Sequence, residues 1–195
     1  MTSRHQERRA ESRAAIRGQI VAAARALVVE HGMPNVSMSA VAKASGVSRQ
    51  TLYNHFDDLE QIILAGVEGA IDEAEAHIAG ALARAPDPAT ALEWYVHGSV
   101  VAVAGDELAA GAGGGMSLGA EARAMDLLER FHTHLKRIMV EGVADGSFRA
   151  DLDPDHSSEV LFHMIGATRM LIAHGRDPEE VARQTARLVS AAVRA

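Results

Sequence analysis

The chain has 195 residues, of which 48% are hydrophobic, a formal net charge of −7 and no cysteine. The missing cysteines exclude a disulfide framework and thiolate metal sites, and they fit a reducing, cytoplasmic location. No apolar run approaches the roughly 20 residues that a membrane span needs, and no apolar segment follows the amino-terminal arginines, so we expect neither a membrane partner nor a secretory signal.

Charge is distributed unevenly along the chain. Residues 1–56 hold eight Lys or Arg and three acidic residues, whereas residues 57–195 hold 11 basic and 23 acidic residues. A basic segment joined to an acidic one indicates that only the first meets a polyanion. We therefore expect two domains, a basic head at 1–56 and a larger acidic body at 57–195.

The head begins with an arginine-rich stretch at residues 1–12, which we expect to be a mobile basic arm. Two roles are open for it, a solubilising tail or a contact with phosphates or the minor groove. From Arg13 onward, apolar residues recur at three- and four-residue steps and predict an amphipathic helix. Gly32 and Pro34 end this helix.

Residues 36–56 predict two short helices joined by a tight turn. Ser37 and Ser48 stand where each helix begins, and a serine hydroxyl there accepts from a free backbone N–H. Gly46 stands at the reversal, where a positive φ is needed. These features indicate a helix-turn-helix, whose second helix enters the major groove of DNA.

The phase of the second helix assigns its faces. At about 100° per residue, Leu52 and Phe56 point together toward the core, while Gln50 and Asn54 fall on the opposite face. Side-chain amides suit the edge of adenine, and hydroxyl or guanidinium groups suit phosphates. The predicted DNA-binding residues are Ser37, Ser48, Arg49, Gln50, Thr51, Tyr53, Asn54 and His55.

The body reads as a series of helices without a convincing strand, which gives an all-α fold of about nine helices. Asp57 and Asp58 are expected to cap the first of them, and Phe148 to be an apolar plug between two others. The glycine-rich stretch 105–119 is expected to be a flexible connection, with a short helix near 106–110, and serves either as a lid or as a plain loop. The expected helices of the body span about 59–84, 89–104, 120–144, 155–174 and 178–193.

Large side chains in the body predict a cavity for an apolar or aromatic small molecule. Ordinary core packing is the alternative for each of them. The candidate ligand-binding residues are Trp94, Tyr95, Met125, Phe131, His132, Leu135, Phe162, His163 and Met164. The histidines lack metal-ligand spacing, and no nucleophile elbow or dinucleotide fingerprint occurs, so we expect no metal, no cofactor and no enzymatic activity.

The head resembles the TetR family of transcriptional regulators. The resemblance rests on a long first helix ending at Gly32 and on the following residues: Ser37, Ala42, Ala44, Gly46, Val47, Thr51, Leu52, Tyr53, His55 and Phe56. The segment 146–154 and the last two helices also look like this family. The family usually has a lysine near the start of its fourth helix, where this chain has Asp57-Asp58-Leu59.

The resemblance implies a homodimer formed through about 155–193, a palindromic DNA operator, and repression relieved by a small-molecule effector. Two other functions stay open from the residues alone. One is a metal- or pH-sensing regulator that uses the histidines, and the other is a helical protein-interaction module. Activation in place of repression is also open, because the sequence predicts binding and not its consequence.

Overall fold

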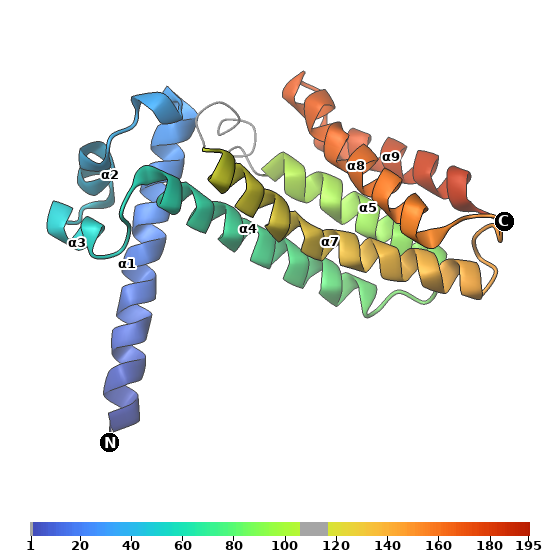
Figure 1. Ribbon diagram of the computed structural model, residues 1–195, viewed down its shortest axis with the longest axis horizontal. Coiled ribbons are helices and arrows are strands. Elements are labelled where there is room, and N and C mark those ends of the chain that lie inside the picture. Colours follow the sequence, from blue (N-terminus) through green and yellow to red (C-terminus); the bar gives the residue numbers. More distant parts are fainter. Residues whose placement is uncertain (1, 106–116) are drawn as a thin grey trace. The chain divides into compact units, whose positions relative to one another are not determined.

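The computed structural model describes residues 2–105 and 117–195, and within these ranges the fold is all helical (Figure 1). The expected short helix at 106–110, and most of the glycine-rich connection, lie outside the described residues. The helices are α1 (Thr2–His31), η1 (Met33–Asn35), α2 (Met38–Ser45), α3 (Arg49–Tyr53), α4 (Leu59–Leu82), α5 (Pro88–Gly105), α7 (Leu118–Ala144), α8 (Pro154–Ala173) and α9 (Pro178–Val193).

Helix α1 begins earlier than its sequence pattern predicts. It starts at Thr2 and runs for 30 residues, so the prediction of a mobile arm at 1–12 is wrong. The arm is rich in Arg, Glu, Gln and Ala, which all favour helix, and only apolar periodicity is missing there. Residues 6–15 are exposed, as expected for a helix that extends beyond its core.

The core of the head is formed by one face of α1 and by the helix-turn-helix. Ile20, Ala24 and Val28 of α1 are fully or almost fully buried and belong to one cluster with Leu52 and Phe56. Gly32, with φ of 76°, ends α1 in a conformation that side chains rarely adopt. The predicted amphipathic stripe thus packs α1 against the two short helices.

The chain divides into two compact units. The first comprises Met1–Gly69 and Glu107–Ala124, and the second Ala70–Asp106 and Met125–Ala195. Two of the three dividing points fall inside a helix, in α4 and in α7, and the third lies outside the described residues. The boundary drawn from the sequence at residue 56 precedes α4. The change in charge near residue 56 predicts where the basic surface ends. Helix α4, however, continues without a break from the first unit into the second.

In the second unit, α5 packs against α8 and α9. Phe148 is 1% exposed, which confirms the predicted plug, and its N–H donates to the carbonyl of Gly142 at 2.8 Å. The N–H of Arg149 donates to the carbonyl of Val193 at 2.9 Å, and Phe148 and Arg194 form an isolated antiparallel bridge. The α7–α8 connection is thereby tied to the end of α9.

Tyr95 is a buried titratable group of this unit. Its side chain is 1% exposed, and its hydroxyl donates to the carbonyl of Phe131 at 3.0 Å. Burial raises the pKa of Tyr95 well above the ordinary value of 10.0, and the neighbouring Ser99 hydroxyl opposes this shift only in part. The folded state therefore holds the phenol proton at pH values where the unfolded chain releases it, so the stabilisation is complete below pH 10.0 and is lost as the pH rises above it.

This linkage can be measured in the Tyr53→Phe variant, in which Tyr95 is the sole tyrosine of the chain. We expect tyrosinate absorbance to appear only above pH 10.0, together with the loss of helical circular dichroism. Ionisation of Tyr95 while the helical signal stays native would contradict the burial argument.

None of the described helices combines the length and the apolarity that a membrane crossing requires.

Candidate functional site

The helix-turn-helix is shaped by the two serine caps that the sequence predicted. The Ser37 hydroxyl accepts from the N–H of Ala40 at 3.2 Å, and the Ser48 hydroxyl accepts from the N–H of Thr51 at 3.0 Å. Gly46 ends α2 with φ of 71°. The hydroxyls of Ser48 and Thr51 are also hydrogen-bonded to each other at 2.8 Å, so both already serve the turn.

Helix α3 has the two faces that its phase predicted. Leu52 is 0% exposed and Phe56, just beyond the helix, is 2% exposed. On the other face Gln50 and Asn54 are exposed, and the Nε2 of Gln50 donates to the Oδ1 of Asn54 at 3.2 Å. The two amides are therefore held next to each other in solvent, with hydrogen-bonding groups left for a base edge.

The other predicted DNA-binding residues surround this amide pair. Arg49 is exposed and Tyr53 is 45% exposed, whereas Thr51 and His55 are half-buried. Ser37 and Ser48 are exposed although their hydroxyls act as caps. The structure thus brings the predicted set to the surface of the head, with the amides free of the core.

Arg17 of α1 belongs to this region although no pattern in the sequence predicts it there. Its guanidinium lies over the ring of Phe56, 4.2 Å from the centroid, and its Nη1 donates to the carbonyl of His55 at 3.5 Å. A cation over an aromatic face is a favourable contact. Since Arg17 and Phe56 are 39 positions apart, no local pattern could have paired them.

The start of α4 is acidic, as expected from its sequence. The Oδ1 of Asp58 accepts from the N–H of Gln61 at 2.8 Å, which confirms the predicted cap, and the Oδ2 of Asp57 accepts from the side-chain amide of Gln61 at 3.0 Å. These carboxylates stand where the resembling family usually has a phosphate-contacting lysine. At these positions, Asp57 and Asp58, the chain has no lysine or arginine that could make this phosphate contact.

Comparison with known families decides the nature of the head. Residues 20–65 match the family model described as bacterial regulatory proteins, tetR family. These residues form a TetR-family DNA-binding domain. The match covers the end of α1, the helix-turn-helix and the first turns of α4, which are the elements whose caps and faces are described above.

Solved structures extend the likeness to the whole TetR-like fold. The fatty acid degradation regulator FadR from Bacillus halodurans superposes with a TM-score of 0.78 at 20% identity, covering 89% of this chain and 93% of its own. FadR from Bacillus subtilis, in complex with stearoyl-CoA, superposes with a TM-score of 0.77 at 20% identity, covering 88% of this chain and 96% of its own. The ketosteroid regulator KstR2 of Mycobacterium tuberculosis superposes with a TM-score of 0.68 at 19% identity, covering 92% of this chain and 95% of its own. No curated protein matches the sequence.

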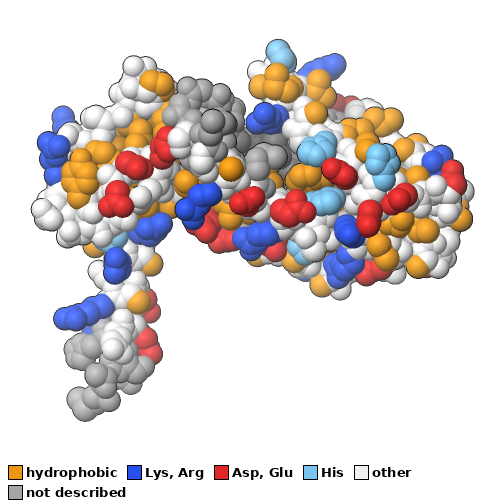
Figure 2. All heavy atoms as spheres, in the orientation of Figure 1, with side chains coloured by type: hydrophobic (Ala, Val, Ile, Leu, Met, Phe, Trp, Pro, Cys, Tyr) orange, Lys and Arg blue, Asp and Glu red, His pale blue; other side chains and the backbone are white. Residues whose placement is uncertain are grey.

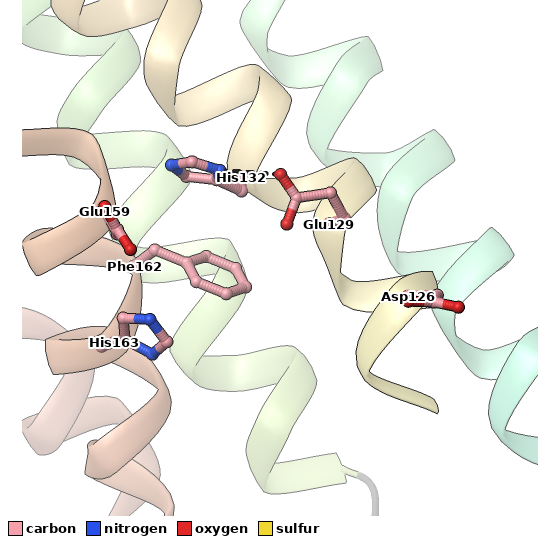
Figure 3. Close-up of a pocket in the computed structure, with 6 residues that line it drawn as sticks. All are labelled: Asp126, Glu129, His132, Glu159, Phe162 and His163. Carbon is pink, nitrogen blue, oxygen red and sulfur yellow. Dashed lines mark hydrogen bonds and ion pairs between the residues drawn. The ribbon is translucent and has the colours of Figure 1, made fainter. Parts of the chain in front are cut away.

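The second unit of this TetR-like protein holds a half-open cavity of about 420 Å³ between α7 and α8 (Figure 3). It is lined by Asp126, Glu129, His132, Glu159, Phe162 and His163. His132 lies between two polar partners, the carboxylate of Glu129 at 3.0 Å and the hydroxyl of Ser158 at 3.2 Å. The ring of Phe162 lies 5.5 Å from that of His132 and 5.7 Å from that of His163, so the cavity has an aromatic wall.

The predicted ligand-binding residues separate into three groups. His132, Phe162 and His163 line the cavity. The side chains of Tyr95, Phe131 and Leu135 are buried in the core, Met164 is half-buried, and Trp94 of α5 is 41% exposed. The side chain of Met125 lies outside what the structure describes.

The acidic residues of the cavity carried no signal in the sequence. Asp126, Glu129 and Glu159 read as ordinary solvated helix positions, and only the pairing of α7 with α8 brings the two segments together. Among the described residues, no group of three or more histidines and carboxylates is close enough to hold a metal ion. Carboxylates beside aromatic rings favour an uncharged or cationic aromatic molecule over an anion.

Proposed function

We propose that this DNA-binding transcriptional regulator is a dimeric repressor that a small-molecule effector releases from a palindromic operator. Residues 1–56 would bind DNA, and residues 57–195 would hold the effector and the dimer interface. The observation that carries the proposal is the exposed amide pair of Gln50 and Asn54 on a capped recognition helix within a TetR-family domain. The role is one of binding, with no catalytic step.

Exposed apolar residues on the last two helices support the dimer. Val160, Met170 and Leu171 of α8 are 51%, 54% and 49% exposed, and Leu188 of α9 is 61% exposed. Apolar side chains gathered on an exposed surface mark an interaction site. Two heads of one dimer would then read successive major grooves, about 34 Å apart on the same side of the duplex.

The dimer can be tested by placing a charge in this surface. We expect Leu188→Glu to produce monomers in light-scattering measurements, because the new carboxylate would lose its hydration in an apolar interface. Val29→Glu is the matched control, since Val29 is an apolar residue of α1 that is 47% exposed. A Leu188→Glu protein that stays dimeric would place the interface elsewhere.

The effector is proposed to occupy the cavity between α7 and α8, which falls within the usual size range of small-molecule sites. FadR from Bacillus subtilis was solved with stearoyl-CoA. The three carboxylates that line the cavity of this chain oppose an anion such as an acyl-CoA, so we infer an aromatic effector without negative charge. Near-complete release from DNA requires about 5.5 kcal/mol of difference in effector affinity between the two states.

The experiment that tests the function is selection of bound duplexes from a random pool, using the full chain. We expect a palindromic site whose binding weakens steeply as salt rises, because basic residues on the head displace counterions from phosphates. Small aromatic molecules are then screened for release of the selected duplex. Failure to enrich any sequence would contradict operator recognition, and release by anions only would contradict the proposed effector class.

A further inference from the structure

One face of α1 changes character where the helix leaves the head. At about 100° per residue, Arg13 falls within about 20° of Ile20 and Ala24, and Arg9 and Arg17 lie about 40° to either side of it. Ile20 and Ala24 are buried in the head. The face that carries the core contacts therefore continues toward the amino terminus as a stripe of arginines.

Contacts within the head show which way this stripe faces. Arg17 packs on the ring of Phe56 and donates to the carbonyl of His55, immediately after α3. One and two turns further out, about 6 and 12 Å along the axis, Arg13 and Arg9 lie on the same face without a part of the head to pack against. Both are exposed, and the described residues offer neither of them an acidic partner.

The opposite side of the helix has a different charge. Glu7 and Glu11 lie about 120° and 160° away from Arg13. Arg8 lies about 140° away in the other direction, and so it also faces away from the stripe. Figure 2 shows Lys and Arg side chains along this part of α1 in the same view as the helix-turn-helix. Positive charge is thus concentrated on the face that leads to the recognition helix.

We propose that α1 is a second DNA-contacting element, in which Arg9 and Arg13 bind backbone phosphates next to the bases that α3 reads. The proposal rests on the proposed function, because the occupant of the stripe is the same operator duplex. A guanidinium pairs well with a phosphate, and B-DNA presents one negative charge per about 1.7 Å of axis. The stripe is also continuous with the surface of the helix-turn-helix through Arg17.

Because the amino-terminal part of α1 is helical, we expect it to contact phosphates and not to enter the minor groove. An α-helix of about 10–12 Å diameter does not enter a minor groove about 6 Å wide, whereas an extended arm does. Arginines on a helix contact the backbone along the edge of a groove. Such contacts add affinity and position the head, and they carry no sequence preference.

The test uses the full chain on the selected operator with native flanking sequence. We expect Arg13→Gln to lower the slope of log affinity against log salt by about 1 per half-site, and Arg9→Gln with Arg13→Gln by about 2. The double variant is expected to bind roughly tenfold more weakly on every operator sequence. Protection of the flanking backbone from hydroxyl radicals is expected to be lost while the protection around the α3 contacts remains.

Arg8→Gln is the matched control, because it removes the same charge from the other side of the helix. Glutamine favours helix nearly as well as arginine, and circular dichroism checks that α1 persists. Equal effects of Arg8→Gln and Arg13→Gln would overturn the proposal, and so would weakening that depends on the flanking bases. If the unaltered protein selects no duplex, the proposed function fails with it; if it binds and the double variant keeps its salt slope, only this inference fails.

Discussion

Replacement of Gln50 by alanine is expected to weaken operator binding by about 1–3 kcal/mol per half-site and to relax the preference at one base pair. Gln50 and Asn54 are hydrogen-bonded to each other at 3.2 Å, so the loss of one amide also frees the other. The preference at the base pair that Asn54 contacts is therefore expected to broaden slightly. Competition binding against operators substituted at each position measures both effects.

The control is Gln19→Ala, which removes an exposed amide from α1. It is expected to leave affinity and sequence preference unchanged. If Gln50→Ala weakens binding equally on all sequences, Gln50 contacts the backbone and does not read a base. Whether Gln50 reads a base is therefore decided by how the loss of affinity varies among operator positions, and not by how large that loss is.

Truncation of Phe148 to alanine is expected to lower the free energy of unfolding by about 3–5 kcal/mol, the usual cost of removing a buried aromatic side chain. Phe148 is 1% exposed and lies against the backbone of α7 at Gly142. A Cβ at position 142 would overlap the Phe148 ring. We therefore expect Gly142→Ala also to destabilise the fold, by about 1–3 kcal/mol, despite the better helix propensity of alanine.

Gly69→Ala provides the matched control for Gly142→Ala. Gly69 lies in α4 with open space where a Cβ would stand, so alanine there is expected to stabilise the protein by about 0.5–1 kcal/mol. Denaturant unfolding of the three variants beside the unaltered protein gives the comparison. A Gly142→Ala protein as stable as Gly69→Ala would show that the Phe148 ring moves aside at little cost.

Local signals account for what the sequence predicted well. The caps at Ser37 and Ser48, the positive φ of Gly46 and the inward phase of Leu52 and Phe56 depend on neighbours within about one helical turn. The helices of the body were placed to within a few residues for the same reason, since apolar spacing and Pro or Gly breaks are local.

Long-range arrangement accounts for what the sequence did not reveal. The contact of Arg17 with Phe56 and the meeting of Glu129 with Glu159 across a cavity require the tertiary fold. The start of α1 was missed because an exposed helix has no apolar stripe, and only the helix propensity of its residues marks it. Tyr95 and Leu135 were candidates for a cavity, but the fold uses them as core.

Trp94 is the sole tryptophan of the chain, and it lies on α5, in the second unit. Its intrinsic fluorescence therefore follows the melting of that unit and is silent about the helix-turn-helix. Far-ultraviolet ellipticity follows the helices of both units. If the two optical signals change at different denaturant concentrations, the first unit and the second unfold as separate cooperative blocks, and a single two-state free energy does not apply to this chain.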